Sequence, residues 1–156
     1  MSVRNVAKQQ CQRLVDTAAS GSTHNLSVPP EGWIATVRKA LGISGAQLGR
    51  MTGRSRATVA GAERSERDRV VSLHTMDVMA KAMGCRFVYA IIPETGSVTE
   101  LVEAQARKKA EALVYEASRH MALEAQAIGP KRQAEQIEQI ARDLVREAPA
   151  DFWEPE

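Results

Sequence analysis

The sequence predicts a mainly α-helical protein, with a core of four to five helices, one short β-strand and long C-terminal helices. Three observations favour this fold class. Only 4% of the residues are aromatic while alanine is frequent, which favours helices over sheets. Apolar residues recur at helical spacing between serines and glycines suited to helix ends. A single β-branched and aromatic run, CRFVYAIIP at 85–93, has the composition of a strand.

Changes in composition divide the chain into three expected parts. Residues 1–30 form an N-terminal helix and linker, residues 31–93 the helical core with the strand, and residues 94–156 a helical extension with an acidic tail. In the first part, apolar Val6, Leu14 and Val15 predict a helix over about 3–19. The following stretch, GSTHNLSVPP, is rich in turn-forming residues and ends in two prolines, so it is expected to be a linker.

The stretch from Gly32 to Glu63 is expected to form three short helices. Trp33, Ile34 and Val37 follow a helical period, and Gly42 stands where a left-handed C-cap is expected. Ser44 can cap a second helix that ends at Gly53, and Ser55 can cap a third over about 55–63. Two short helices joined by a tight glycine-containing turn are typical of a helix-turn-helix.

Charge within this stretch has one sign. No Asp or Glu occurs before Glu63, whereas five basic residues are present: Arg38, Lys39, Arg50, Arg54 and Arg56. The whole chain has a formal net charge of only +2. A local basic patch on a nearly neutral chain predicts a nucleic-acid-binding face.

The same stretch resembles the helix-turn-helix of lambdoid phage repressors, through Arg38, Leu41-Gly42, Ser44, Gln47-Leu48, Gly53, Ser55, Thr58-Val59 and Glu63. The resemblance implies that residues 55–63 are a recognition helix in the major groove of double-stranded DNA. It places Arg56, Ala57 and Gly61 at base-reading positions. Arg56 could bind a guanine edge and Ala57 a thymine methyl. Gly61 departs from the pattern, because it has no side chain to read a base. It either permits close backbone approach to DNA or leaves fewer base contacts.

Other polar residues of the stretch are expected at phosphates or at helix caps. The expected phosphate contacts are Ser44, Gln47, Arg54, Ser55, Thr58 and Arg64. Arg64 immediately precedes a charged stretch, SERDRVVS at 65–72, and could equally belong with it to a solvated loop. The resemblance also implies an internal ion pair between Arg38 and Glu63. The alternative is that Arg38 belongs to the DNA-binding patch while Glu63 faces solvent.

Beyond this block, Ser72 can cap a fourth helix that directs Met76, Met79 and Met83 inward. The strand at 85–93 has no visible partner elsewhere in the chain, although strand backbone groups require one. We therefore expect two copies to pair through this strand as a homodimer, with these residues at the interface: Phe87, Val88, Tyr89, Ala90 and Ile91. A strand packed on its own domain, or no strand at all, is the alternative.

The last part is expected to contain two helices. Ser97 and Glu100 form a capping box at the start of a helix that is expected to reach Ile128. Gly129 ends it, and Pro130 can begin the final helix, in which Ile137, Ile140 and Leu144 share a face. Phe152 and Trp153 lie among acidic residues, as anchors in a protein groove or as part of a frayed tail.

Residues 1–110 also resemble the family called mobile mystery protein A, through GWIATVRKALGIS, ERSE and SLHTMDVMAKAMGCRFVYAIIP. In that family the neighbouring gene commonly encodes a Fic-domain protein. The resemblance implies a transcriptional repressor that regulates its own two-gene module, or an antitoxin that binds and neutralises a Fic-domain partner. The N-terminal helix could dock on the core, lie against DNA or wait for a partner.

One motif of Fic inhibitors has a literal match that we reject. The string from Ser27 to Gly32 fits the pattern of a helix that presents a blocking glutamate, here Glu31. Pro29 and Pro30 prevent that string from being a helical turn. In a second partial match, from Thr99 to Glu103, Ala104 replaces the final Gly or Asn.

Enzymatic activity is not expected. The chain contains no phosphate-binding glycine loop and no nucleophile motif. Two distant cysteines, Cys11 and Cys85, and three scattered histidines give no support for a metal site, and no cofactor is expected. Because no long apolar segment and no signal peptide are visible, we expect a cytoplasmic protein that does not bind membranes.

Overall fold

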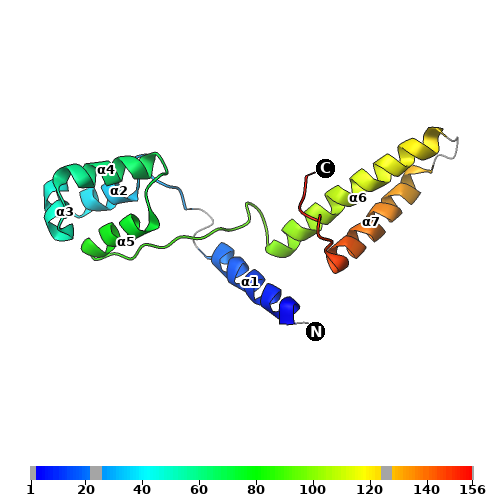
Figure 1. Cartoon of the computed structure of the whole chain (residues 1–156), viewed down its shortest axis with the longest axis horizontal. Helices are drawn as coiled ribbons and strands as arrows, with labels where there is room; N and C mark the ends of the chain where they lie inside the picture. Colours follow the sequence, from blue (N-terminus) through cyan, green and yellow to red (C-terminus); the bar gives the residue numbers. More distant parts are fainter. Residues whose placement is uncertain (1–2, 22–25, 124–127, 156) are drawn as a thin grey trace. The chain divides into compact units, whose positions relative to one another are not determined.

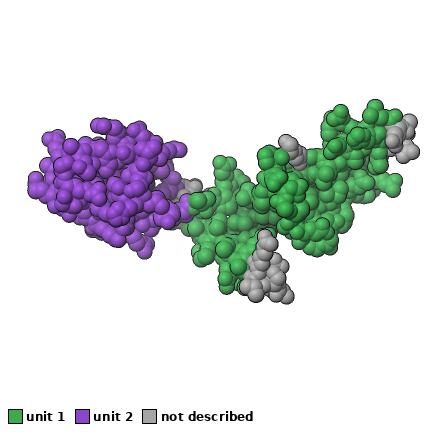
Figure 2. Space-filling view, in the orientation of Figure 1, with its two compact units in different colours: residues 1–21, 91–156 green, residues 22–90 purple. Residues whose placement is uncertain are grey.

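The computed structural model describes residues 3–21, 26–123 and 128–155, and the chain is mainly α-helical (Figure 1). The described residues contain seven helices. They divide into two compact units (Figure 2), one of residues 22–90 and the other of residues 1–21 together with 91–156. This division differs from the three parts expected from sequence, because the N-terminal helix belongs with the C-terminal helices. Among the described residues, no helix is both long and apolar enough to cross a bilayer.

The unit of residues 22–90, the basic unit below, is built from four short helices: α2 (Trp33–Ala40), α3 (Gly45–Thr52), α4 (Arg56–Arg67) and α5 (Leu73–Ala82). Each contributes apolar residues to one core, in which Ile34, Leu48, Val59, Ala62, Met76 and Met79 are buried. Leu48 and Met79 are fully inaccessible to solvent. The methionines of α5 therefore fill the core, as their spacing predicts.

Serines begin three of these helices, and the predictions of their caps are confirmed. Ser44, Ser55 and Ser72 each accept a hydrogen bond from the backbone N–H three residues later. Helix α4 extends beyond the expected end at residue 63, to Arg67. The charged residues after Glu63 resembled a loop in sequence. They are helical because their apolar neighbour Ala62 is buried and because Glu66 bonds to α2, as described below.

The other unit contains α1 (Val3–Ser20), α6 (Val98–Leu123) and α7 (Pro130–Glu147). Helices α6 and α7 lie side by side as a hairpin (Figure 1). Buried Ala106, Ala110 and Val114 line α6 at helical spacing, and small side chains there allow α7 to approach closely. Ser97 and Glu100 form the predicted capping box, with bonds of 2.9 and 3.3 Å. The expected continuation of α6 to Ile128 is wrong at that residue, which is not helical, and residues 124–127 lie outside the described part.

Helix α1 and the C-terminal segment both contact α6. Asp16 of α1 accepts a hydrogen bond from the backbone N–H of Val98, at 2.8 Å. Phe152 is buried, and its carbonyl accepts a hydrogen bond of 2.8 Å from Gln105. The residues around Phe152 are thus neither frayed nor free to bind a partner through that ring, because Phe152 is already held by its own chain. Trp153, by contrast, is 59% exposed.

The strand expected at 85–93 is not confirmed. Residues 85–92 follow α5 without forming any strand in the described part of the chain. This stretch includes the residues expected at the dimer interface, none of which is in a strand: Phe87, Val88, Tyr89, Ala90 and Ile91. A strand is defined by backbone hydrogen bonds to a neighbour, and a single copy of this chain offers no neighbouring strand among its described residues.

Candidate nucleic-acid interface

The turn between α3 and α4 is short and sterically tight. Only Gly53, Arg54 and Ser55 separate the two helices. Gly53 has a φ of 66°, the left-handed conformation that ends helices, and the Arg54 N–H donates to the Gly49 carbonyl at 2.7 Å. A Cβ atom on Gly49 would lie 2.7 Å from the Arg54 carbonyl oxygen. Gly49 therefore lets α3 lie directly against the turn that starts α4.

The beginnings of α3 and α4 are neighbours on the surface. A Cβ atom on Gly45, the first residue of α3, would be 3.8 Å from Cγ of Arg56, the first residue of α4. Most residues predicted to contact DNA are exposed there or along α4: Ser44, Gln47, Ser55, Arg56, Ala57, Thr58 and Arg64. Arg54 and Gly61 are half-buried. The structure thus brings most of the predicted site residues to the surface of α3, α4 and the turn between them.

Three of the expected phosphate contacts, Ser44, Gln47 and Ser55, also cap helices with their side chains. Ser44 Oγ accepts from Gln47 N–H at 3.1 Å, and Gln47 Oε1 accepts from Ser44 N–H at 2.7 Å. Ser55 Oγ accepts from Thr58 N–H at 3.1 Å. These bonds fix the side chains at the two helix N-termini, where free backbone N–H groups and the helix dipole favour an anion.

Four arginines along α3, the turn and α4 have no acidic partner among the described residues. Arg50, Arg54, Arg56 and Arg64 form no ion pair there, whereas Lys39 pairs with Glu31. The basic unit contains ten Lys and Arg residues against five Asp and Glu, and the rest of the chain contains eleven against fourteen. Positive charge is therefore concentrated in the unit that carries α3 and α4, and it is uncompensated at their surface.

The predicted ion pair between Arg38 and Glu63 is present and links α2 to α4. Arg38 Nε donates to Glu63 Oε1 at 2.6 Å, and Nη2 donates to Oε2 at 3.3 Å. Arg38 Nη1 also donates to the Ile43 carbonyl at 3.1 Å. The two side chains are only 15% and 13% exposed. The hydrogen bond to Glu63 raises the pKa of Arg38 above its ordinary value.

Glu66 makes a second link between α4 and α2 that the sequence did not reveal. Its two carboxylate oxygens accept from the backbone N–H groups of Trp33, at 2.6 Å, and Ile34, at 2.9 Å. They cap the start of α2, whose own N-cap residue, Gly32, has no side chain to do so. Gly32 has a φ of 85°, and a Cβ atom there would lie 2.7 Å from a Glu66 oxygen. No local sequence pattern signals this contact, because Glu66 and Trp33 are 33 residues apart.

The rejected Fic-inhibitor string is not helical. Residues 26–29 are irregular, and residues 30–31 form a turn before α2. The Glu31 carboxylate accepts a hydrogen bond from Thr36 and pairs with Lys39. The bond from Lys39 is the main cause that lowers the pKa of Glu31. Glu31 is thus bound to residues of α2, the helix that follows it. In the second partial match, Thr99 to Glu103 lies within α6, as expected.

Comparisons with protein-family models, with curated proteins and with solved structures each find no match to this chain. These comparisons therefore do not test the two resemblances described above, to lambdoid-type repressors and to mobile mystery protein A. The function proposed next is inferred from the positions, contacts and charges of this chain's own residues.

Proposed function

We propose that this protein is a sequence-specific DNA-binding transcriptional regulator, a repressor, in which α3 and α4 form a helix-turn-helix. One observation carries the proposal: the N-termini of α3 and α4 lie together at the surface, and Arg54 and Arg56, which have no acidic partner among the described residues, stand at the start of α4. Phosphate groups are the natural counterions for such a surface. An exposed helix with a basic first residue can also enter the major groove.

Residues at this surface fall into two roles. Arg56, Ala57 and Gly61 are assigned to base edges, because Arg56 and Ala57 are exposed at the start of α4 and half-buried Gly61 follows Ala57 by one helical turn. Arg56 can donate two hydrogen bonds to one guanine. The phosphate-contacting set is Ser44, Gln47, Arg54, Ser55, Thr58 and Arg64, which fixes the register of the helix on the duplex.

Helix α2 supports the helix-turn-helix through bonds to α4. Glu63 and Glu66 lie one turn apart on α4 and bind opposite ends of α2, through Arg38 and through the first backbone N–H groups of α2. These bonds restrain rotation of α4 about its own axis. Such rotation would move the base-reading side chains out of position.

We further propose that the regulator acts as a homodimer that represses its own two-gene module. Two copies place two α4 helices on half-sites about one helical turn of DNA apart. We do not propose that the protein neutralises a Fic-domain partner, because no contact or surface of the described residues favours that function over DNA binding.

The test is binding to the DNA upstream of the protein's own gene, followed by fluorescence anisotropy, with a scrambled duplex of equal length beside it. We expect tighter binding to the upstream DNA and a steep loss of affinity between about 50 and 200 mM salt. Equal affinity for both duplexes across this range would contradict sequence-specific binding.

Substitution of Arg56 separates the two kinds of contact. Arg56→Ala should weaken binding to the upstream DNA by about 1–3 kcal/mol, with a much smaller effect on the scrambled duplex. Arg119→Ala, an exposed arginine of α6 in the other unit, is the matched control and should change neither affinity. A similar loss on both duplexes would show that Arg56 contacts only phosphate.

A further inference from the structure

The segment from Arg86 to Ile92 has the properties of a strand edge without its partner. Within the described part of the chain, none of its residues donates or accepts a backbone hydrogen bond. Apolar side chains are nevertheless exposed along it, with Val88 at 59%, Tyr89 at 71% and Ile91 at 92%. Exposed backbone groups combined with exposed β-branched and aromatic side chains are a template for pairing with another strand.

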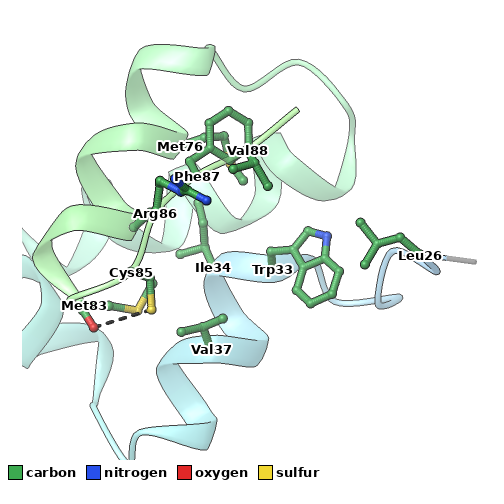
Figure 3. A pocket seen from close by; sticks show the side chains of 11 residues that line it. Leu26, Trp33, Ile34, Val37, Met76, Met83, Cys85, Arg86, Phe87 and Val88 are labelled. Carbon is green, nitrogen blue, oxygen red and sulfur yellow. Dashed lines mark hydrogen bonds between the residues drawn. The ribbon is translucent and has the colours of Figure 1, made fainter. Parts of the chain in front are cut away.

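The start of this segment is extended and anchored. The rings of Phe87 and Tyr89, two residues apart, stack with centroids 5.8 Å apart, so both lie on one side, as in a strand. Phe87 packs against the core of the basic unit, and the Cys85 N–H donates to the Ala80 carbonyl at 2.8 Å. Figure 3 shows Phe87 and Val88 at the wall of an apolar groove that Trp33 and Ile34 also line. The beginning of the segment is therefore fixed on the basic unit, and the backbone groups that follow are available for pairing.

We propose that a second copy of this chain is that partner, through antiparallel pairing of residues 86–94 in both copies across a twofold axis at Ala90. The proposal deepens the homodimer proposed above and rests on it, but it does not depend on DNA binding. We choose a second copy because two antiparallel copies of this segment place complementary side chains opposite each other.

Charge complementarity sets the register. An axis at Ala90 places Arg86 opposite Glu94 of the second copy at both ends of the ribbon, and Tyr89 opposite Ile91. Neither Arg86 nor Glu94 forms an ion pair among the described residues, and both are exposed. An axis at Tyr89 would instead set Arg86 opposite Ile92. Opposite charges and aromatic–β-branched pairs are favourable across strands, so the axis at Ala90 is preferred.

The position of Pro93 agrees with this register. Residue pairs in an antiparallel ribbon alternate between hydrogen-bonded and non-bonded. Pro93 has no N–H, so it must belong to a non-bonded pair, here with Phe87 of the second copy. The odd-numbered residues are then non-bonded, and Val88, Ala90 and Ile92 donate to the ladder. Ala90, opposite its own copy, presents only a methyl group at the axis.

Disulfide cross-linking of the full chain tests the register. In a Cys11→Ser, Cys85→Ser background, Ala90→Cys should form a covalent dimer under mild oxidation, because the Cα atoms of a hydrogen-bonded pair, about 5.5 Å apart, are within disulfide reach. Tyr89→Cys is the matched control, because Tyr89 faces Ile91 rather than its own copy. Faster cross-linking through Tyr89→Cys would overturn the axis at Ala90.

Charge reversal tests the same pairing without a new covalent bond. Arg86→Glu alone and Glu94→Arg alone should each weaken the dimer in sedimentation, and the double variant should restore it. A parent protein that remains monomeric at tens of micromolar, or a double variant no better than the singles, would overturn the proposal. Dimers that cross-link as expected but bind no DNA would support this inference and contradict only the proposed function.

Discussion

At the residue scale, two glutamates of α4, one helical turn apart, make different contacts with α2. Glu63 neutralises Arg38, and Glu66 occupies the start of α2 by accepting from two backbone N–H groups. Both carboxylates have low exposure, so removing either leaves a partly buried polar group of α2 without its partner. Such a loss is costly, because the group left behind is only partly accessible to water and loses its main hydrogen-bond partner.

The ion pair of Arg38 and Glu63 gives the first prediction. Glu63→Ala should lower the free energy of unfolding by about 2–4 kcal/mol, since Arg38 would remain largely buried without a counter-charge. Thermal unfolding followed by circular dichroism measures this as a clear fall in Tm. Glu31→Ala, which removes the acid of an exposed pair with Lys39, is the control and should leave Tm nearly unchanged. Equal Tm values for Glu63→Ala and the parent would mean that the pair contributes nothing.

Local chemistry explains which of these residues could be predicted. The caps at Ser44, Ser55 and Ser72 depend on residues three apart, so the sequence alone predicted them. The bond from Glu66 to Trp33 spans 33 residues, and no local pattern signals it. The pairing of Arg38 with Glu63 spans 25 residues and was predicted only because a resemblance supplied the long-range information. Single-sequence patterns thus predict caps well and contacts between helices poorly.

At the element scale, the α3–turn–α4 unit depends on how closely its two helices approach. Gly49 lies against the backbone of the turn, whereas for Gly61, on α4, no neighbouring atom of the described residues lies within 4 Å of where its Cβ would be. The two glycines therefore have opposite expected responses to the same added methyl group. The sequence marked Gly61 as a departure from the repressor pattern and gave Gly49 no special role, because close approach is a tertiary property.

Substitution of these two glycines by alanine is the second prediction. Gly49→Ala should destabilise the protein by about 1–3 kcal/mol, because the new methyl meets the Arg54 carbonyl and forces the turn to shift. Gly61→Ala should stabilise it by up to about 1 kcal/mol, because alanine favours a helix interior and has open space there. Chemical denaturation measures both. A stabilised Gly49→Ala variant would contradict the tight turn.

The same Gly61→Ala variant reports on DNA recognition, which is the third prediction. Its added methyl meets no atom of the residues that the structure describes, so a loss of affinity would come from DNA that lies close to the α4 backbone. If Gly61 serves close approach, binding to the upstream duplex should weaken although the protein is more stable. Unchanged affinity in an anisotropy titration would show that Gly61 does not contact DNA and that fewer residues read the bases.

At the scale of the whole molecule, charge is divided between the two units. The basic unit carries an excess of five positive charges, and the other unit an excess of three negative charges. Composition along the chain predicted this division, although it did not predict that α1 would belong with α6 and α7. Their association requires Asp16 to meet Val98, 82 residues away. Attraction to DNA is therefore expected from the basic unit alone, while the acidic unit is repelled by phosphates.

The last prediction concerns the salt dependence of the dimer. The slope of log affinity against log salt concentration is proportional to the number of phosphates neutralised, and a dimer with two α4 helices contacts about twice as many as a monomer. Val88→Pro removes a donor of the proposed ribbon, so this variant should sediment as a monomer and bind the upstream DNA more weakly, with about half the parent's slope. Tyr89→Pro is the control, because the Tyr89 N–H points away from the second copy in the proposed register, and it should keep more of the dimer. A Val88→Pro variant with the parent's slope and sedimentation would show that the ribbon does not join the two copies and that another surface must present the two α4 helices.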